Sequence, residues 1–540
     1  MVAFQRELSR KSGNFLTITF VALTVFLLSF GTQAPAQTIA FKQAVAAAAA
    51  KDPDIAAFYK ERDYKPIWTG SDDRQRRKAF LSAASKATDH GLPAGRYDAA
   101  QLTRDFGAFK SAKARGILEV ETTKRFLQYA QDIQSGILDP IKVDNEINVF
   151  PPRRDRLVML QTFATGSPQA FLKSLPPKHP DYTRLLKEKV RLEKLLAQGG
   201  YGEKVPGKAI KPGKSGDRVV ALRRRLTAMG YIKLGISPDY NEALEKAVAV
   251  FQVDHGLNPD GVAGGATLAT MNVSTQTRLQ QVIVGLERQR WLNIPRGKRH
   301  IFVNQADFRA HVMDDGKPTL TTRVVIGKAY KFRTPEFSDT MSHMIINPTW
   351  HVPKSIARNE YLPMLKKNPA ALSRQGIRMT DIRGQRVDPT TLDYSEYDAT
   401  NFPFDLKQPP SRGNALGKVK FMFPNKFNIY LHDTPSKSLF AKDTRTYSHG
   451  CVRVQKPFEL AYTLLGPQSS DPQTEFHNIL DRGLERQVDL EQPIPVYLVY
   501  HTVWITPNGR PNYRLDPYKR DKKIFSALQK AGVVLRAVRG

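Results

Sequence analysis

The sequence predicts a multidomain α+β protein that is helical in its N-terminal part and rich in β-strands in its C-terminal part. Three observations support this fold class. Alanine-rich and amphipathic segments occupy the region from about 40 to 200, a compact helical unit follows at 215–275, and short strand-like runs with turn signals begin near 280. The length of 540 residues corresponds to three or four domains.

The first forty residues have the features of an export signal. Basic residues at positions 6, 10 and 11 precede the uncharged apolar run 15–30, and small residues follow at 34–36. Sixteen apolar residues are short for a bilayer span of about twenty, so we expect residues 1–36 to be a cleaved signal peptide. An uncleaved signal that anchors the chain in the membrane is the alternative. Both place the protein in the periplasm or cell envelope.

The formal net charge of +31 raises the question of an anionic partner. Lysine and arginine are spread along the whole chain, no nucleic-acid-binding motif is present, and the export signal directs the chain away from nucleic acid. We therefore expect no nucleic-acid partner and a peripheral contact with anionic envelope components. A solvated basic surface is the alternative, and the sequence predicts no oligomeric state.

Residues 37–200 are expected to form a helical scaffold domain. The segment 44–50 is nearly all alanine, the best helix former, and 54–59 and 123–130 carry apolar residues three and four positions apart. Proline pairs at 151–152 and 176–177 mark breaks between helices. This region contains no cluster of catalytic residue types, so its expected role is structural.

Residues 201–275 are expected to form a second, small domain. Helical spacing of apolar residues from Val219 to Met229 ends at Gly230, a second helix follows from about Asn241 to Phe251, and a glycine-rich turn occupies 256–264. This pattern resembles the small three-helix peptidoglycan-binding domain. The resemblance leaves two roles open, namely binding of glycan and a spacer that has lost that affinity.

Residues 276–540 are expected to form a β-rich catalytic domain, because short apolar strands alternate there with turn signals. The segment 314–317 is typical of a hairpin turn, and 507–510 of another. The expected strands are 300–304, 308–312, 321–327, 344–346, 418–422, 429–431 and 496–504. Between them, residues 359–372 have a helical pattern and 391–408 an irregular one.

The chain carries one cysteine, Cys451, with His432 nineteen positions before it. A lone cysteine forms no intramolecular disulfide, and a free thiol in an exported protein is exposed to oxidation unless it is buried or used. A thiol with a pKa of roughly 8.5 becomes a nucleophile when a histidine accepts its proton. His432 follows a predicted strand, and His449 is the other candidate base. Gly450 permits a tight turn that directs the amides of Gly450 and Cys451 at an oxyanion. The alternative for Cys451 is a buried, inert side chain.

The spacing of these residues resembles a known signature. His432, fifteen further residues and then Ser448-His449-Gly450-Cys451 match the pattern of YkuD-type L,D-transpeptidases, and the segments 347–353, 414–420 and 431–435 agree with it. The whole layout resembles the large multidomain members, which have a helical scaffold, a peptidoglycan-binding module and a catalytic domain with a capping insertion. We expect that insertion at about 355–410, where it would shield a thioester from water. An inert excursion is the alternative.

The resemblance implies roles for individual residues. Cys451 would be the nucleophile and His432 its base, His449 and Ser448 would shape the pocket, and Gly450 would form the oxyanion hole with Cys451.

Three further residues would contact substrate, namely Arg453, Trp350 and Asn347. Small members of the family often carry asparagine where this chain has Arg453, whereas arginine is usual in the large members. An arginine there could hold a substrate carboxylate through two hydrogen bonds, and a structural salt bridge is the alternative.

The implied reaction is the formation of 3→3 cross-links in peptidoglycan, the cell-wall polymer that maintains cell shape. Cys451 would attack the third residue of a tetrapeptide stem, expel D-alanine and form a thioester, which a second stem's side-chain amine then resolves. The partners would be stem peptides and glycan, no metal or organic cofactor would be needed, and carbapenems would acylate the same thiol. Three alternatives remain. With water as acceptor the enzyme would be an L,D-carboxypeptidase, and with a lipoprotein lysine as acceptor it would be an anchoring enzyme. With a decayed site the protein would be a non-catalytic wall-binding scaffold.

Overall fold

The computed structural model describes residues 36–535 except 234 and 236, so the expected signal peptide lies outside the described residues apart from its last position. The described chain divides into two compact units. The first comprises residues 36–137, 151–179 and 528–534. The second comprises residues 138–150, 180–527 and 535. No helix in the described part of the chain is both long and apolar enough to cross a bilayer.

The first unit is helical, which confirms the expected fold class of this region. Residues 36–49 are helical, and the further helices are α2 (Pro53–Glu61), α3 (Arg74–Ser85), α4 (Ala94–Tyr97), α5 (Ala99–Ala108), α6 (Ala112–Ser135), α8 (Arg156–Thr165) and α9 (Pro168–Ser174). The Trp68 ring packs against Phe80, Phe126 and Phe163 at centroid distances of 5.5, 5.4 and 5.2 Å. Such aromatic packing gives this unit a hydrophobic core of its own.

Two segments of the range expected for the scaffold pack with the second unit. These are residues 138–150, which include α7 (Pro140–Val143), and α10 (Pro180–Ala197). Helix α10 packs along α14 (Thr275–Trp291), and the amide of Leu138 donates a 2.9 Å hydrogen bond to Glu287 on α14. The second unit is therefore built from segments that are far apart in the sequence.

The three-helix domain within the second unit is confirmed. It consists of α11 (Asp217–Ala228), α12 (Glu242–Asp254) and α13 (Gly265–Met271), whose apolar faces share one core. Asn241 caps α12, because its side chain accepts a hydrogen bond from the amide of Leu244. The helical spacing in the sequence thus corresponds to the buried face of each helix.

This small domain is attached to the hairpin formed by β14 (Val503–Ile505) and β15 (Pro511–Tyr513). Arg510 forms a 2.7 Å ion pair with Asp254, and Arg514 donates to the Asp254 carbonyl over 2.7 Å. Gly256 has a φ of +71°, and a Cβ there would lie 2.7 Å from the Arg514 Nε. The turn after α12 therefore requires glycine, both for its backbone conformation and for its contact with the hairpin.

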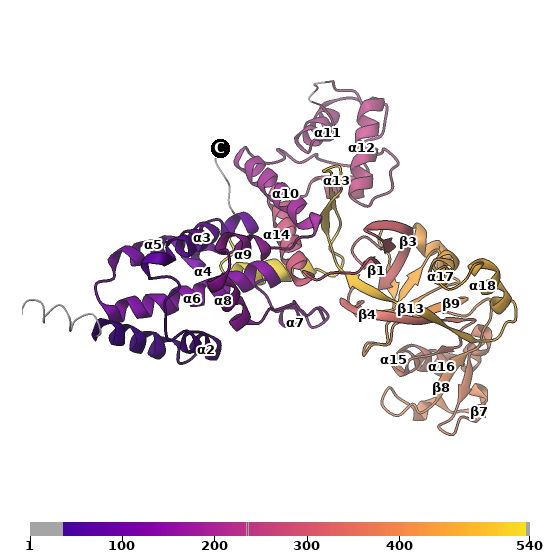
Figure 1. Ribbon diagram of the computed structural model, residues 1–540. Coiled ribbons are helices and arrows are strands. Elements are labelled where there is room, and N and C mark those ends of the chain that lie inside the picture. The colour runs from indigo at the N-terminus through magenta and orange to yellow at the C-terminus, as the bar shows by residue number, and fades with distance from the viewer. Residues whose placement is uncertain (1–35, 234, 236, 536–540) are drawn as a thin grey trace, which may run out of the picture. The chain divides into compact units, whose positions relative to one another are not determined.

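The β-rich part of the second unit is built on a nine-stranded sheet with α17 (Pro457–Leu465) and α18 (Pro472–Leu480) packed on it (Figure 1). The chain also contains α19 (Arg520–Lys530). The strands are β1 (Arg299–Asn304), β2 (Arg309–Asp314), β3 (Lys317–Gly327), β4 (Phe337–Ile346), β9 (Val419–Met422), β10 (Leu431–His432), β11 (Thr446–Ser448), β12 (Val452–Val454) and β13 (Arg486–Val499). Their order is β11-β3-β12-β10-β9-β4-β13-β1-β2.

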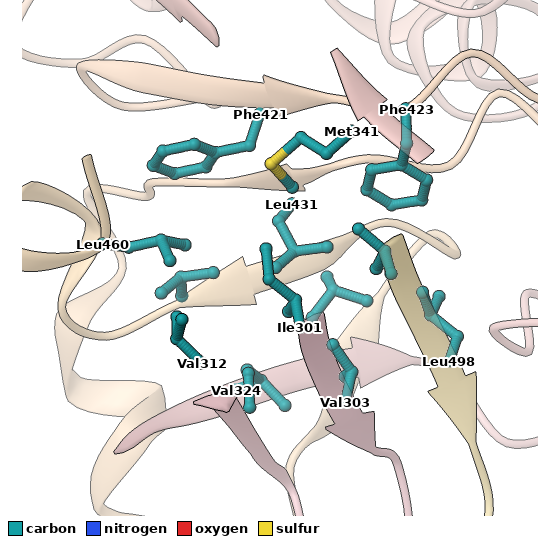
Figure 2. Close-up of a cluster of buried hydrophobic side chains, with 14 of the residues drawn as sticks. Ile301, Val303, Val312, Val324, Met341, Phe421, Phe423, Leu431, Leu460 and Leu498 are labelled. Carbon is teal, nitrogen blue, oxygen red and sulfur yellow. The ribbon is translucent and has the colours of Figure 1, made fainter. Parts of the chain in front are cut away.

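The sheet closes on itself, because β3 pairs with β2 along its first part and with β12 along its second. Figure 2 shows side chains from opposite sides of this closed sheet meeting in one core, including Ile301, Met341, Phe421 and Leu498. The expected hairpin at 314–317 is present, since Asp314 pairs with Lys317. Side chains alternate along each strand, so every second residue points into this core and the residues between them point away from it.

Two expected strands differ from the structure. Of the run 429–431, only Leu431 belongs to a strand. The run 496–504 is divided, because β13 ends at Val499 and β14 begins at Val503. At the division the Asn304 side chain both donates to and accepts from the backbone of His501, each over 2.9 Å. A side-chain amide replaces the strand partner there, and the direction of the chain changes.

The insertion forms a small subdomain with its own core. Its strand order is β5-β8-β6-β7, with β5 (Trp350–His351), β6 (Arg378–Thr380), β7 (Arg386–Val387) and β8 (Asp405–Gln408), and its helical segments include α15 (Lys354–Ile356), a π-helical turn (Ala357–Tyr361) and α16 (Leu362–Lys367) (Figure 1). The expected helix at 359–372 is confirmed in part. The expectation of an irregular 391–408 is wrong at its end, because β8 joins β5 to β6 and buries Leu406.

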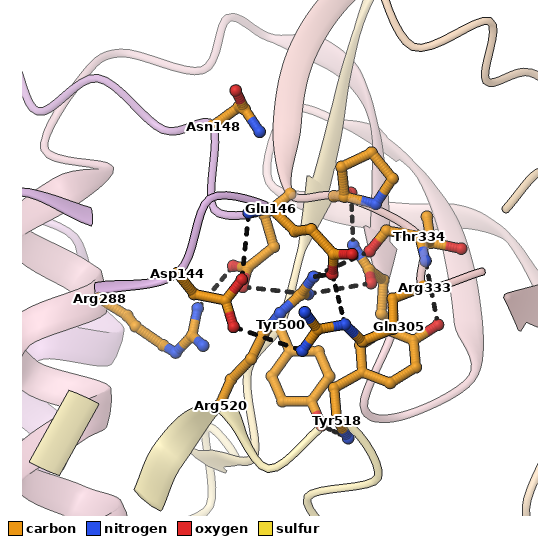
Figure 3. Close-up of polar contacts among 12 residues, drawn as sticks. Asp144, Glu146, Asn148, Arg288, Gln305, Arg333, Thr334, Tyr500, Tyr518 and Arg520 are labelled. Atoms are coloured by element: carbon orange, nitrogen blue, oxygen red, sulfur yellow. Dashed lines mark hydrogen bonds and ion pairs between the residues drawn. The ribbon is translucent and has the colours of Figure 1, made fainter. Parts of the chain in front are cut away.

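A segment that we call the strap, residues 144–148, lies beside the start of β4. Ile147 forms a parallel bridge with Glu336, whose amide donates to the Glu146 carbonyl over 2.8 Å. Arg520 is fully buried and forms an ion pair with Glu146 at 3.3 Å (Figure 3). It forms a second ion pair with Glu336 at 3.2 Å. Arg288 of α14 pairs with the other oxygen of Glu336 at 2.5 Å. The strap thus completes a buried charged network inside the second unit.

Candidate active site

The site is built on three neighbouring strands. β10 pairs with β12 in parallel, so His432 lies opposite Arg453, and β9 places Lys420 on the other side of His432. The preceding residues Leu431 and Val452 are fully buried in the core. Because side chains alternate along a strand, Lys420, His432 and Arg453 face away from the core as a single row.

This row forms part of a cavity of about 650 Å³. The cavity brings together six of the residues expected at the site, namely Cys451, His432, Ser448, His449, Arg453 and Trp350. The insertion supplies part of the wall, including Ile356, Glu360 and Tyr361. At this size the cavity can enclose a segment of a peptide-sized ligand.

Cys451 lies between β11 and β12 and is half-buried. Its thiol donates to the carbonyl of Asn428, with Sγ and O 3.5 Å apart. Burial raises the pKa of the Cys451 thiol to about 11, although hydrogen bonds from Tyr430 and the charges of Arg453 and Lys420 act in the opposite direction. The thiol is therefore protonated near neutral pH.

His432 is buried, with 4% of its surface exposed. Its Nδ1–H donates to the Asp433 carbonyl over 2.5 Å, so the neutral ring carries its lone pair on Nε2. Burial lowers the pKa of His432 to about 3, and the positive charges of Arg453 and Lys420 act in the same direction. The imidazole is therefore neutral near pH 7, in the state that a proton acceptor requires.

The Asp433 side chain holds the chain next to this histidine in place. Its Oδ2 accepts from the amide of Lys418 over 2.9 Å, and its Oδ1 pairs with Lys437 at 2.5 Å. A Cβ at Gly417 would lie 2.3 Å from this carboxylate, so only glycine fits there. The carbonyl to which His432 donates is thereby fixed.

The turn at Gly450 has a φ of +115°, a conformation that favours glycine. The Gly450 carbonyl accepts a 2.6 Å hydrogen bond from the Thr334 hydroxyl, and the Ser448 hydroxyl donates to the Cys451 carbonyl. Ser448 and Gly450 are both buried, and these hydrogen bonds give them a structural role next to the thiol. The two bonds hold the peptides on both sides of Cys451.

Thr334 connects this turn to the buried network of Figure 3. Its amide donates to the Tyr518 hydroxyl over 3.2 Å, and its carbonyl accepts from Arg520 over 3.1 Å. The Tyr518 hydroxyl in turn donates to the Gly327 carbonyl over 2.7 Å. The ion pairs of Arg520 are therefore linked to the Cys451 turn through one threonine.

His449 contacts the insertion. Its Nε2 lies 2.5 Å from the Glu360 Oε1, and its ring packs on Phe332 with a centroid distance of 4.6 Å. Two residues that are 89 positions apart therefore meet at the edge of the cavity. One nitrogen of His449 is engaged by this contact.

Arg453 and Trp350 line the cavity, whereas Asn347 does not. The Arg453 Nε is buried without a hydrogen-bond partner, and among the described residues Arg453 forms no ion pair with a carboxylate. Asn347 is 2% exposed with a φ of +50°, and its side chain donates to the Leu480 carbonyl over 2.8 Å. The expectation that Asn347 contacts substrate is therefore corrected, because its amide is used to fix a turn.

Five residues of this site were not singled out from the sequence, namely Thr334, Glu360, Lys420, Asn428 and Tyr430. Lys420 lies beside His432 on a neighbouring strand, and Tyr430 lies two positions before it, so strand pairing and alternation could have indicated both. Burial, followed by the nearby Cys451 sulfur, raises the pKa of Tyr430. Thr334 and Glu360 come from distant segments and left no signal in the sequence.

Comparison with known families assigns three regions. Residues 53–188 match the model "Scaffold domain", residues 215–271 match "Putative peptidoglycan binding domain", and residues 298–474 match "L,D-transpeptidase catalytic domain". The chain therefore contains a YkuD-type L,D-transpeptidase catalytic domain and a peptidoglycan-binding domain next to its helical scaffold.

A curated relative from Haemophilus influenzae, described as "Putative L,D-transpeptidase", is 32% identical over 241 residues, or 45% of this chain. The chain spans about half the length of that relative (48%). Two solved L,D-transpeptidases were also matched. The one from Xylanimonas cellulosilytica (residues 123–326) is 16% identical, covers 55% of this chain and 100% of its own, and has a TM-score of 0.17. The one from Stackebrandtia nassauensis is 14% identical, covers 55% and 97%, and has a TM-score of 0.22.

Proposed function

We propose that this protein is a peptidoglycan L,D-transpeptidase that forms 3→3 cross-links through a thioester on Cys451. The main support is that Cys451 and His432 line the same cavity, with His432 held neutral by burial and its Nδ1 bonded to the Asp433 carbonyl. A neutral imidazole beside a thiol is the pairing that nucleophilic catalysis by cysteine requires.

In the proposed first half-reaction, the Cys451 sulfur attacks the carbonyl carbon of the third residue of a tetrapeptide stem. His432 accepts the thiol proton at Nε2 and then donates it to the leaving amine of D-alanine. Because the resting thiol and imidazole are both neutral, proton transfer accompanies the attack rather than preceding it. The charges of Lys420 and Arg453 favour the negative sulfur that develops.

The oxyanion that forms during this attack needs hydrogen-bond donors. The Cys451 amide is the proposed donor, supported by the two hydrogen bonds that hold the peptides on both sides of this residue. Gly450 is proposed to act through its backbone conformation. Ser448 and His449 are proposed to shape the surrounding wall.

Arg453 is proposed to bind a carboxylate of the donor stem. It is a partly buried cation in the cavity wall whose Nε has no hydrogen-bond partner, a state that a carboxylate would satisfy. Trp350, on the same wall as Tyr361, is proposed to supply apolar contact to the stem.

In the proposed second half-reaction, the side-chain amine of another stem attacks the thioester carbon. The C–S bond breaks and its electron pair goes to sulfur, while the attacking amine loses one proton to His432, which passes that proton to the thiolate. Peptidoglycan would thus be both donor and acceptor, and we propose a location in the cell envelope. The matched peptidoglycan-binding domain supports this partner.

The decisive experiment incubates the protein with a disaccharide-tetrapeptide and identifies the products by mass spectrometry. A dimer that lacks one D-alanine is the expected product, and tripeptide alone would indicate an L,D-carboxypeptidase instead. Cys451→Ala is expected to abolish both products, and His432→Ala to slow acylation strongly. Activity retained by Cys451→Ala would refute the mechanism. An unchanged acylation rate in His432→Ala would transfer the role of base to His449.

A further inference from the structure

The wall of the active-site cavity carries charges of both signs, and they come from different parts of the fold. The cations Lys420 and Arg453 lie on the strands of the sheet, beside His432. Among the described residues that line the cavity, Glu360 is the one carboxylate, and it comes from the insertion. A cationic ligand group that enters this cavity would therefore find its counter-charge on the insertion.

Glu360 is held in a defined position. It lies in the π-helical turn Ala357–Tyr361, and its Oε1 accepts a hydrogen bond from the His449 Nε2 over 2.5 Å. Single π-helical turns inside helices are frequent at functional sites. The Glu360 side chain is 39% exposed, and a carboxylate has more acceptor positions than this one hydrogen bond uses. Its remaining capacity is available to a ligand in the cavity.

We propose that Glu360 binds the side-chain ammonium group of the acceptor stem, so that the insertion supplies the acceptor site. This inference rests on the proposed transpeptidase function. The two substrates differ at their reacting ends, since the donor stem ends in a carboxylate and the acceptor stem presents an ammonium. Lys420 and Arg453 attract the first and repel the second, so the acceptor needs a carboxylate to approach Cys451.

The chemical step balances with the residues present. The acceptor ammonium loses one proton to Glu360, which is exposed enough to pass it to water. The neutral amine then attacks the thioester carbon, a C–N bond forms, and the C–S bond breaks with its electron pair on sulfur. The amine's second proton passes through His432 to the thiolate. The products are the amide cross-link, the thiol and one proton in solvent.

The test uses the full chain, an unlabelled tetrapeptide donor and an isotope-labelled tripeptide acceptor that has a free side-chain amine but no terminal D-alanine. Mass spectrometry gives the cross-linked dimer and the hydrolysed tripeptide at increasing acceptor concentration. Glu360→Gln keeps an acceptor for the His449 hydrogen bond but removes the charge. Its apparent KM for the acceptor is expected to rise roughly tenfold or more, the effect of losing one hydrogen bond to a charged group.

Glu396→Gln is the matched control, because Glu396 is an exposed glutamate of the same insertion that does not line the cavity. It should leave the acceptor KM unchanged, whereas Glu360→Asp should recover part of the loss. A wild-type acceptor KM in Glu360→Gln would overturn the inference. If Glu360→Gln lowered the rates of acylation and of dimer formation by the same factor, the inference would also be overturned, because Glu360 would then act only through His449. A wild-type protein that forms no dimer would refute the proposed function and this inference together.

Discussion

Replacing Thr334 by valine tests whether the buried network controls the reactive turn. Thr334 is fully buried, and its hydroxyl donates to the Gly450 carbonyl over 2.6 Å and accepts from the Gly327 amide over 3.0 Å. Valine has nearly the same shape, so the substitution removes the hydroxyl and leaves no large cavity. One buried carbonyl and one buried amide would then lack these partners.

Each unsatisfied buried group costs about 1–3 kcal/mol, so Thr334→Val is expected to lower the free energy of unfolding by about 2–4 kcal/mol once the strands adjust. The catalytic effect should be separate. If the Gly450–Cys451 peptide shifts, the proposed oxyanion donor is misplaced, and loss of one such donor reduces kcat by about 100-fold to 1,000-fold. We expect roughly a tenfold to hundredfold decrease, because the amide is displaced rather than removed.

The assays are urea unfolding for stability and single-turnover formation of the acyl-enzyme, followed by intact-protein mass spectrometry. Thr334→Ser keeps the hydroxyl and should restore the acylation rate, and Thr340→Val is the control, because Thr340 is an exposed threonine on β4. If Thr334→Val acylated at the wild-type rate with unchanged stability, the network would have no influence on the turn and the reasoning would be refuted.

Two further predictions concern the thiol and the charged network. Alkylation of Cys451 by iodoacetamide should accelerate about tenfold per pH unit from pH 7 to 10, because only the thiolate reacts and burial raises the thiol pKa to about 11. A rate that levels off near pH 8.5, as in the urea-unfolded protein, would contradict this pKa. Glu336→Gln should cost about 3–5 kcal/mol of unfolding free energy, since it removes the charge shared by the buried Arg288 and Arg520. Glu146→Gln should cost less, because Glu146 is 31% exposed, and equal losses in urea titrations would show that burial does not determine the effect.

The residues of the site that could be predicted are those that lie close together in the sequence. The Ser448–Cys451 turn is local, and the φ of Gly450 explains why glycine stands beside Cys451. Asn347 was assigned to substrate from a matching segment, which gives the position of a residue but not the direction of its side chain. The structure shows its amide bonded to the end of α18 through the Leu480 carbonyl.

The parts that could not be predicted depend on contacts between distant segments. Thr334 reaches Gly450 across 116 positions and Glu360 reaches His449 across 89, and neither residue type marks a site by itself. Strand β8 was missed because its four residues give too short an alternation, and its role as the middle of a sheet depends on partners at Trp350 and Arg378. Tertiary packing therefore determines the positions of Thr334, Glu360 and β8, whereas local sequence spacing determines the Ser448–Cys451 turn.

The strap has a consequence for the order in which this chain folds. Arg520 meets Glu146 and Lys523 meets Asp144 across 374 and 379 positions, so these contacts form late and require most of the chain. Until residues 518–523 arrive, Thr334 lacks its hydrogen bonds to Tyr518 and Arg520, and the turn that carries the thiol lacks its final support. A partly synthesised chain would therefore carry Cys451 without a finished site, and this site would be complete only at the last stage of assembly.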